Sequence, residues 1–173
     1  MKGDKQMKIK ILLVALVLCI VSAWLASPVM ADDNMTFHGT LMENPPCEIN
    51  NGQPIEISFD EVGVNKIDGQ NYAQTFNMMY QCSGNGQDVV VRYVGDVTAF
   101  DNAAVKSNIT DFGINLRSQS VNGVLTDFNV GTTLPVSADQ TSLTFVATPV
   151  KRKGADLPGE HFISSAMLQL EYP

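Results

Sequence analysis

The chain has 173 residues, 11 of them basic and 18 acidic, and a formal net charge of −7. An acidic chain is a poor binder of nucleic acid, because the phosphate backbone attracts basic surfaces. Beyond residue 31 its one basic cluster, Lys151-Arg152-Lys153, is predicted to form a turn between strands.

The first 31 residues have the pattern of a secretory signal peptide. Four lysines between positions 2 and 10 precede an apolar run from Ile11 to Ala26, and Val29-Met30-Ala31 supplies small residues at the cleavage site. The apolar run is short for a membrane span. Either Met1 or Met7 can be the start, because the basic and apolar parts remain without the first six residues.

Cleavage after Ala31 would leave 142 residues, enough for one domain with its own core. Cleavage removes four lysines and one aspartate, so 7 basic and 17 acidic residues remain and the net charge becomes −10. The remaining cysteines, Cys47 and Cys82, are predicted to form a disulfide, because thiols of exported proteins are usually oxidised. Closing this loop would stabilise the fold by roughly 3–4 kcal/mol.

The residues from Asp32 to Leu41 show an alternating pattern that predicts a β-strand. Met35, Phe37, Gly39 and Leu41 share one face, and mainly polar residues occupy the other. Two interpretations remain open. The segment is either the first strand of the domain's own sheet or an N-terminal arm that pairs with another molecule.

The middle of the chain alternates short apolar–polar segments with turns that contain glycine and proline. Strands are predicted over residues 55–59, 72–82, 88–94, 112–116 and 143–149. Turns are predicted over residues 50–52, 83–86 and 121–124, and loops over residues 61–71, 129–140 and 154–159. Residues 96–108 fit either a helical turn or a loop.

The last segment, residues 160–173, alternates again and predicts a strand with one buried face. The even positions of that face are Phe162, Ser164, Ala166, Leu168, Leu170 and Tyr172. No later segment of this sequence can pair with the far edge of this strand. An open apolar edge of this kind can accept a strand from another chain. The alternative is an ordinary terminal strand of a complete fold.

About seven short strands and no long helix are expected after the signal segment. This pattern predicts an all-β fold, an antiparallel β-sandwich of the immunoglobulin type, without a second domain.

The sequence offers no set of residues for catalysis. The two histidines, His38 and His161, lie in strand patterns and are expected to face solvent. No Gly-x-Ser-x-Gly elbow or phosphate-binding loop occurs, and two cysteines with distant histidines are too few ligands for a metal site. The sequence therefore predicts a protein that is not an enzyme and that binds no cofactor.

Several stretches resemble the subunits of chaperone–usher pili, or fimbriae. They are Phe37-x-Gly39-x-Leu41, Pro45-Pro46-Cys47-x-Ile49-Asn50-Asn51-Gly52 and Ile109-Thr110-Asp111-Phe112-Gly113-Ile114. Cys82 at the end of a strand, the last strand itself and the penultimate residue Tyr172 agree as well. The sequence is most similar to the minor tip adaptor of P pili, the PapF type. Gly159 lies one place further from the end than the corresponding glycine of the family.

The resemblance implies an incomplete immunoglobulin-like sandwich, the pilin fold, which lacks its final strand and is completed by a donor strand from a partner. It implies a signal peptide over residues 1–31, a donor-strand arm over residues 32–41 and a pilin domain over residues 42–173. The implied groove-filling residues of the arm are Met35, Phe37, Gly39 and Leu41. The implied acceptor edge, which would also contact the chaperone, comprises Phe162, Ala166, Leu168, Leu170 and Tyr172.

The implied partners are a periplasmic pilus chaperone, an outer-membrane usher and neighbouring pilus subunits. The chain would pass through the periplasm to a fimbrium on the cell surface and serve as a minor structural subunit or adaptor that contributes to adhesion. A rod-forming major pilin and a terminator subunit are alternatives. A glycan-binding adhesin is disfavoured, because 142 residues leave no room for an extra lectin domain.

Overall fold

The computed structural model describes residues 36–41, 46–83, 88–136 and 140–172. The chain divides into two units, Met1–Leu41 and Met42–Pro173. The expected signal peptide and Met35 lie outside the described residues, as does most of the turn expected at 83–86. Within the described ranges, no helix is long and apolar enough to cross a membrane.

The larger sheet contains six antiparallel strands. Five of them lie in the order β1 (Cys47–Ile49), β2 (Gln74–Cys82), β8 (Ser142–Lys151), β5 (Phe112–Gln119) and β4 (Ala104–Lys106). A sixth strand, β6 (Leu125–Asp127), pairs with β5 through the turn predicted at residues 121–124, where Gly123 has a φ of 78°. Glycine suits this turn because side chains with a Cβ atom rarely adopt a positive φ.

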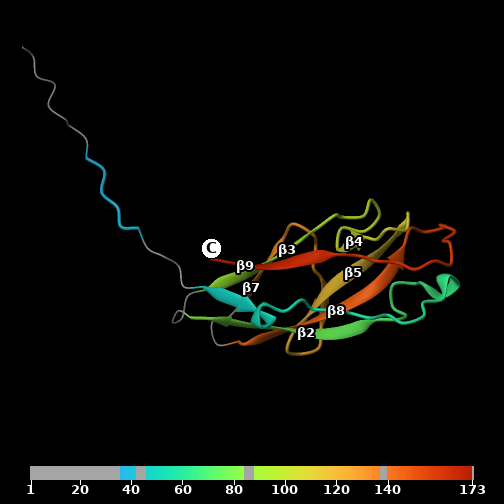
Figure 1. Ribbon diagram of the computed structural model, residues 1–173, viewed down its shortest axis with the longest axis horizontal. Coiled ribbons are helices and arrows are strands. Elements are labelled where there is room, and N and C mark those ends of the chain that lie inside the picture. Colours follow the sequence, from blue (N-terminus) through green and yellow to red (C-terminus); the bar gives the residue numbers. More distant parts are fainter. Residues whose placement is uncertain (1–35, 42–45, 84–87, 137–139, 173) are drawn as a thin grey trace, which may run out of the picture. The chain divides into compact units, whose positions relative to one another are not determined.

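The smaller sheet contains three antiparallel strands in the order β7 (Thr133–Val136), β3 (Val89–Gly95) and β9 (Ala166–Glu171). β9 lies at one edge of this sheet and pairs with β3 from Glu171, opposite Val90, to Ala166, opposite Gly95. Figure 1 shows β9, in red, running alongside β3.

The core lies between the two sheets and follows the alternation of apolar residues along the strands. Met78, Tyr93 and Phe145 are among its most completely buried side chains. The ring centroids of Phe76 and Phe145 are 5.7 Å apart, those of Phe145 and Phe128 5.9 Å, and those of Phe128 and Tyr93 5.4 Å. Since Phe145 belongs to the larger sheet and Tyr93 to the smaller one, these rings join the two layers. The predicted antiparallel sandwich is confirmed.

The strand predicted over residues 55–59 does not form. Ile55, Ile57 and Phe59 are half-buried and alternate with the exposed Glu56 and Ser58, so the predicted alternation is present. The segment is nevertheless paired with none of the described strands. A strand requires a partner for its backbone N–H and C=O groups, and periodicity alone does not reveal whether that partner exists.

Four short strands, β1, β4, β6 and β7, occur where the sequence predicted none. β4 falls in residues 96–108, which fitted a helical turn or a loop, because Ala104 and Val105 are buried by pairing with β5. β7 falls in the predicted loop 129–140 and places Pro135 opposite Val90 of β3. Proline is tolerated there because an edge strand needs no outer partner for its backbone. The described part of the chain therefore has nine strands rather than about seven.

The last strand is shorter than the predicted range of 160–173. β9 begins at Ala166, and before it only Ser164 forms an isolated bridge, to Ser107. β3 ends at Gly95, opposite Ala166, so the residues before Ala166 lack a long partner strand. Phe162 therefore precedes the strand instead of lying in it.

The predicted disulfide is present between Cys47 of β1 and Cys82 of β2, which lie opposite each other, with an S–S distance of 2.01 Å. The turn predicted at residues 50–52 is the short 3₁₀ turn η1 (Asn50–Gly52), in which all three residues have a positive φ. A second turn, η2 (Val64–Lys66), lies in the predicted loop 61–71. In the basic cluster, Lys151 ends β8 and the turn follows it, so that prediction is right for Arg152 and Lys153.

Candidate functional site

Among the described residues from 46 onward, a largely apolar groove of about 1640 Å³ is present. One wall is the extended segment 53–63 and the other is formed by residues 159–168, which lead into β9. The floor consists of core side chains, among them Tyr93, Val105, Ile109, Phe112, Ile114, Leu116 and Ala147. The groove therefore opens directly onto the hydrophobic core.

The first wall, segment 53–63, directs Ile55, Ile57 and Phe59 toward the core, where they pack against buried residues. Its backbone follows an extended course without belonging to either sheet of the described chain. Within this segment, residues 55–59 pair with no strand of the described chain, and a stretch of this kind beside apolar side chains can pair with an added strand.

The second wall is the edge of the smaller sheet. Among the described residues, β9 pairs with β3 alone, so its other edge is free to pair. Leu168 and Leu170 are half-buried against the core, whereas Ala166 and Met167 are exposed. An apolar strand with an unpaired edge is a site where another chain can add a strand.

An aromatic contact joins the two walls at one place. The ring centroids of Phe59 and Phe162 are 6.1 Å apart, and Phe162 meets Phe112 of the floor edge-on at 4.8 Å. Tyr93, also in the floor, is almost fully buried, and this burial raises the pKa of its hydroxyl above the usual range. A neutral, aromatic floor of this kind suits apolar side chains of an incoming strand.

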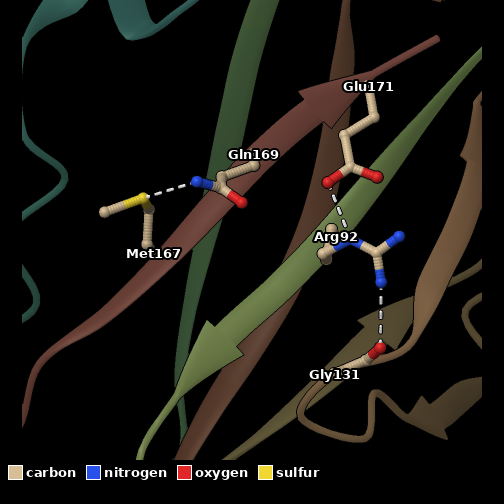
Figure 2. Close-up of polar contacts among 5 residues, drawn as sticks. All are labelled: Arg92, Gly131, Met167, Gln169 and Glu171. Atoms are coloured by element: carbon tan, nitrogen blue, oxygen red, sulfur yellow. Dashed lines mark hydrogen bonds and ion pairs between the residues drawn. The ribbon is translucent and has the colours of Figure 1, made fainter.

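An ion pair connects β9 to β3 on the outer face of the smaller sheet. Arg92 Nε lies 2.7 Å from Glu171 Oε1, and one terminal nitrogen of Arg92 donates to the carbonyl oxygen of Gly131 at 3.1 Å. Both contacts are drawn in Figure 2. The hydrogen bond from Arg92 lowers the pKa of Glu171, and the same contact raises the pKa of Arg92. Gln169 Nε2 donates to Met167 Sδ at 3.1 Å on the same strand.

Three of the predicted acceptor residues, Phe162, Ala166 and Leu168, line the groove. Leu170 packs against the core next to them. Tyr172 contacts the disulfide instead: its hydroxyl lies 3.2 Å from Cys47 Sγ and donates to it, since a disulfide sulfur carries no hydrogen.

Sequence reasoning missed the first wall, because residues 55–59 looked like an ordinary strand of the sandwich. The floor residues were recognised only as strand residues of the core. A signal for the wall was present in the sequence. The Asn50-Asn51-Gly52 turn precedes residues 55–59 and Gly63 follows them, so this strand pattern is separated from the predicted strands on either side.

The N-terminal segment is described from Thr36 onward, and residues 36–41 form no strand with any described residue. Phe37 is 87% exposed and Leu41 is fully exposed, while a Cβ atom at Gly39 would meet nothing within 4 Å. His38 and His161 are both exposed, as predicted. Among the described residues, no cluster of His, Cys, Asp and Glu could hold a metal ion.

Residues 35–172 match the family described as fimbrial protein. The fimbrial-like protein YfcQ of Escherichia coli K12 is 28% identical over 161 residues, which cover 90% of this chain and 94% of the relative. The minor fimbrial protein PrsF of Escherichia coli is 26% identical over 153 residues, which cover 83% of this chain and 90% of the relative.

A solved structure of the P pilus adaptor subunit PapF aligns with a TM-score of 0.56 at 25% identity, covering 76% of this chain and 98% of PapF. The similarity therefore extends from the sequence to the fold. On this sequence match and this structural likeness, the chain belongs to the fimbrial protein family and is a chaperone–usher fimbrial subunit with an immunoglobulin-like fold.

Proposed function

We propose that the chain is a minor adaptor subunit of a fimbrium that both accepts and donates a β-strand. The observation that carries this proposal is the apolar groove between segment 53–63 and the edge of β9 with which no described strand pairs. A strand added there would supply backbone partners to both walls and cover the core residues of the floor.

On the accepting side, the first occupant would be a strand lent by a periplasmic chaperone, and its replacement would be the arm of a neighbouring subunit at the outer-membrane usher. Phe162, Ala166, Leu168, Leu170 and Tyr172 would form the acceptor edge with its chaperone contact. The half-buried state of Leu168 and Leu170 supports this role, because a strand beside them would remove more of their surface from water.

On the donating side, the arm of residues 32–41 would enter the groove of the next subunit. Met35, Phe37, Gly39 and Leu41 would face that groove, with glycine where little space remains for a side chain. Exposure of Phe37 and Leu41 supports this role. Burying Phe37 alone would stabilise the joint by roughly 1.5–3 kcal/mol.

The adaptor role is supported by the likeness to the adaptor PapF and the minor subunit PrsF. The finished subunit would lie in a fimbrium on the cell surface and contribute to adhesion. A rod subunit differs from an adaptor in accepting the arm of its own kind, so the two roles are separated by whether copies of this chain polymerise with one another.

The test is co-expression in a bacterial periplasm with a pilus chaperone and further subunits, comparing the mature chain with a form lacking residues 32–41. Both forms should co-purify with the chaperone and accept a strand from a further subunit, and only the form with the arm should donate a strand to one. Phe37→Ala should weaken this donation by about 10- to 100-fold. His38→Ala, on the opposite face of the arm, is the matched control.

Failure of the shortened form to fold would mean that residues 32–41 belong to the domain's own core, and the donor role would fall. Long homopolymers of the mature chain would identify a rod subunit instead of an adaptor. A stable monomer that does not bind the chaperone would contradict the adaptor role and the rod role alike.

A further inference from the structure

The residues just before β9 are tied to the end of β4 by a polar seam, defined as Lys106–Asn108 together with 161–164. The backbone N–H of Asn108 donates to the carbonyl oxygen of Ile163 at 3.1 Å. Ser164 Oγ donates to the carbonyl oxygen of Lys106 at 2.8 Å, and Ser107 forms a bridge with Ser164. The seam thus links the larger sheet, through β4, to the wall of the groove.

The Asn108 side chain holds the backbone on both sides of Phe162. Its Nδ2 donates to the carbonyl oxygen of His161 at 3.2 Å, and its Oδ1 accepts from the N–H of Ile163 at 2.7 Å. An amide side chain has both a donor and an acceptor, so it can replace a neighbouring strand at a place where none continues.

In an extended chain, alternate residues turn their backbone N–H and C=O groups to opposite edges. The carbonyl of His161 and the N–H of Ile163 are turned toward Asn108, so the backbone groups of Phe162 are turned to the opposite edge. That edge borders the groove, which Phe162 lines. The ring of Phe162 lies against Phe59 and Phe112 at the same place.

We propose that Asn108 is a positioning residue of the acceptor groove, which presents the backbone and ring of Phe162 to an incoming strand. This inference rests on the proposed strand-accepting function. Asn108 touches no incoming strand itself. It sets the hydrogen-bonding register at this end of the groove by holding His161 and Ile163 in place.

The test uses the full mature chain co-expressed with a periplasmic pilus chaperone as the strand donor. The complex of Asn108→Ala should dissociate about tenfold faster than the wild-type complex, since two side-chain hydrogen bonds that order the wall are lost. Asn108→Asp keeps the acceptor for the N–H of Ile163 and should fall between the two. Asn122→Ala, an exposed asparagine in the β5–β6 turn, is the matched control.

Hydrogen exchange distinguishes positioning from a general loss of stability. In the wild type, chaperone binding should protect the amide of Phe162. In Asn108→Ala that protection should be lost, while the amides of β9 that pair with β3 stay protected. Unchanged dissociation with unchanged Phe162 protection would overturn the inference, as would an equal loss of protection along all of β9. A wild-type chain that binds no chaperone would instead overturn the proposed function itself, and this inference with it.

Discussion

Gly113 of β5 lies where the sandwich leaves no room for a side chain. A Cβ atom at this position would come within 2.5 Å of the carbonyl oxygen of Val105 and 2.6 Å of Thr98 Cγ2. Val105 belongs to the edge strand β4, which pairs with β5. The close approach at Gly113 is therefore between these two neighbouring strands. The glycine of the Phe112-Gly113-Ile114 stretch is therefore required by packing.

Gly113→Ala should lower the free energy of unfolding by about 1–3 kcal/mol, because backbone atoms must shift to admit the methyl group. Urea unfolding followed by circular dichroism measures this change. Gly159→Ala is the control, since a Cβ atom there meets nothing within 4 Å, and its effect should stay within about 0.5 kcal/mol. Equal effects of the two substitutions would contradict the packing argument.

β9 carries the acceptor edge on one side and depends on β3 on the other. The ion pair between Arg92 and Glu171 connects the two strands on the outer face of the sheet. Because the hydrogen bond from Arg92 lowers the pKa of Glu171 in the folded state, this carboxylate contributes stability above its unfolded pKa of about 4.3. The contribution is lost as the pH falls through the lower folded pKa.

The stability of the wild type should therefore exceed that of Glu171→Gln at pH 7, and the difference should shrink as the pH falls below about 4.3. Thermal unfolding at a series of pH values, at low salt, measures both forms. Glu160→Gln, which removes an exposed carboxylate outside the described strands, is the control. A difference between wild type and Glu171→Gln that is constant from pH 7 to about pH 3 would exclude this linkage.

At the scale of the whole molecule, the disulfide and the groove are connected by the course of the chain. Cys47 and Cys82 are 35 residues apart, and the loop between them contains segment 53–63, the wall that belongs to neither sheet. Tyr172, just after β9, donates its hydroxyl hydrogen to Cys47 Sγ. The disulfide therefore limits the freedom of one wall and contacts the end of the other.

Replacing both cysteines by alanine should lower the free energy of unfolding by about 3–4 kcal/mol, because the unfolded chain gains the entropy of an open loop. Urea unfolding under oxidising conditions measures the loss. Reduced wild type should behave like the double variant, and reductant should leave the double variant unchanged. Retention of full stability after reduction would show that closing this loop does not stabilise the fold.

The periodic features were predictable from the sequence, because they depend on residues close together in the chain. Alternation in β2, β3, β5 and β8 identified the main strands, and the two cysteines identified the disulfide. The same local signal was misleading where pairing decides the outcome. Residues 55–59 alternate but pair with no described strand, and β7 pairs although it lies in a predicted loop and contains Pro135.

The sequence by itself determined the all-β fold, the cysteine pair and the alternating pattern of residues 32–41, since each is a matter of residue type and spacing. Only the tertiary structure decided that segment 53–63 is a wall of a groove, that Phe59 meets Phe162 across it, and that Asn108 holds the backbone of Ile163. The physical reason is distance along the chain. Asn108 and Ile163 are 55 residues apart, and no local pattern specifies which distant backbone groups an amide side chain will reach.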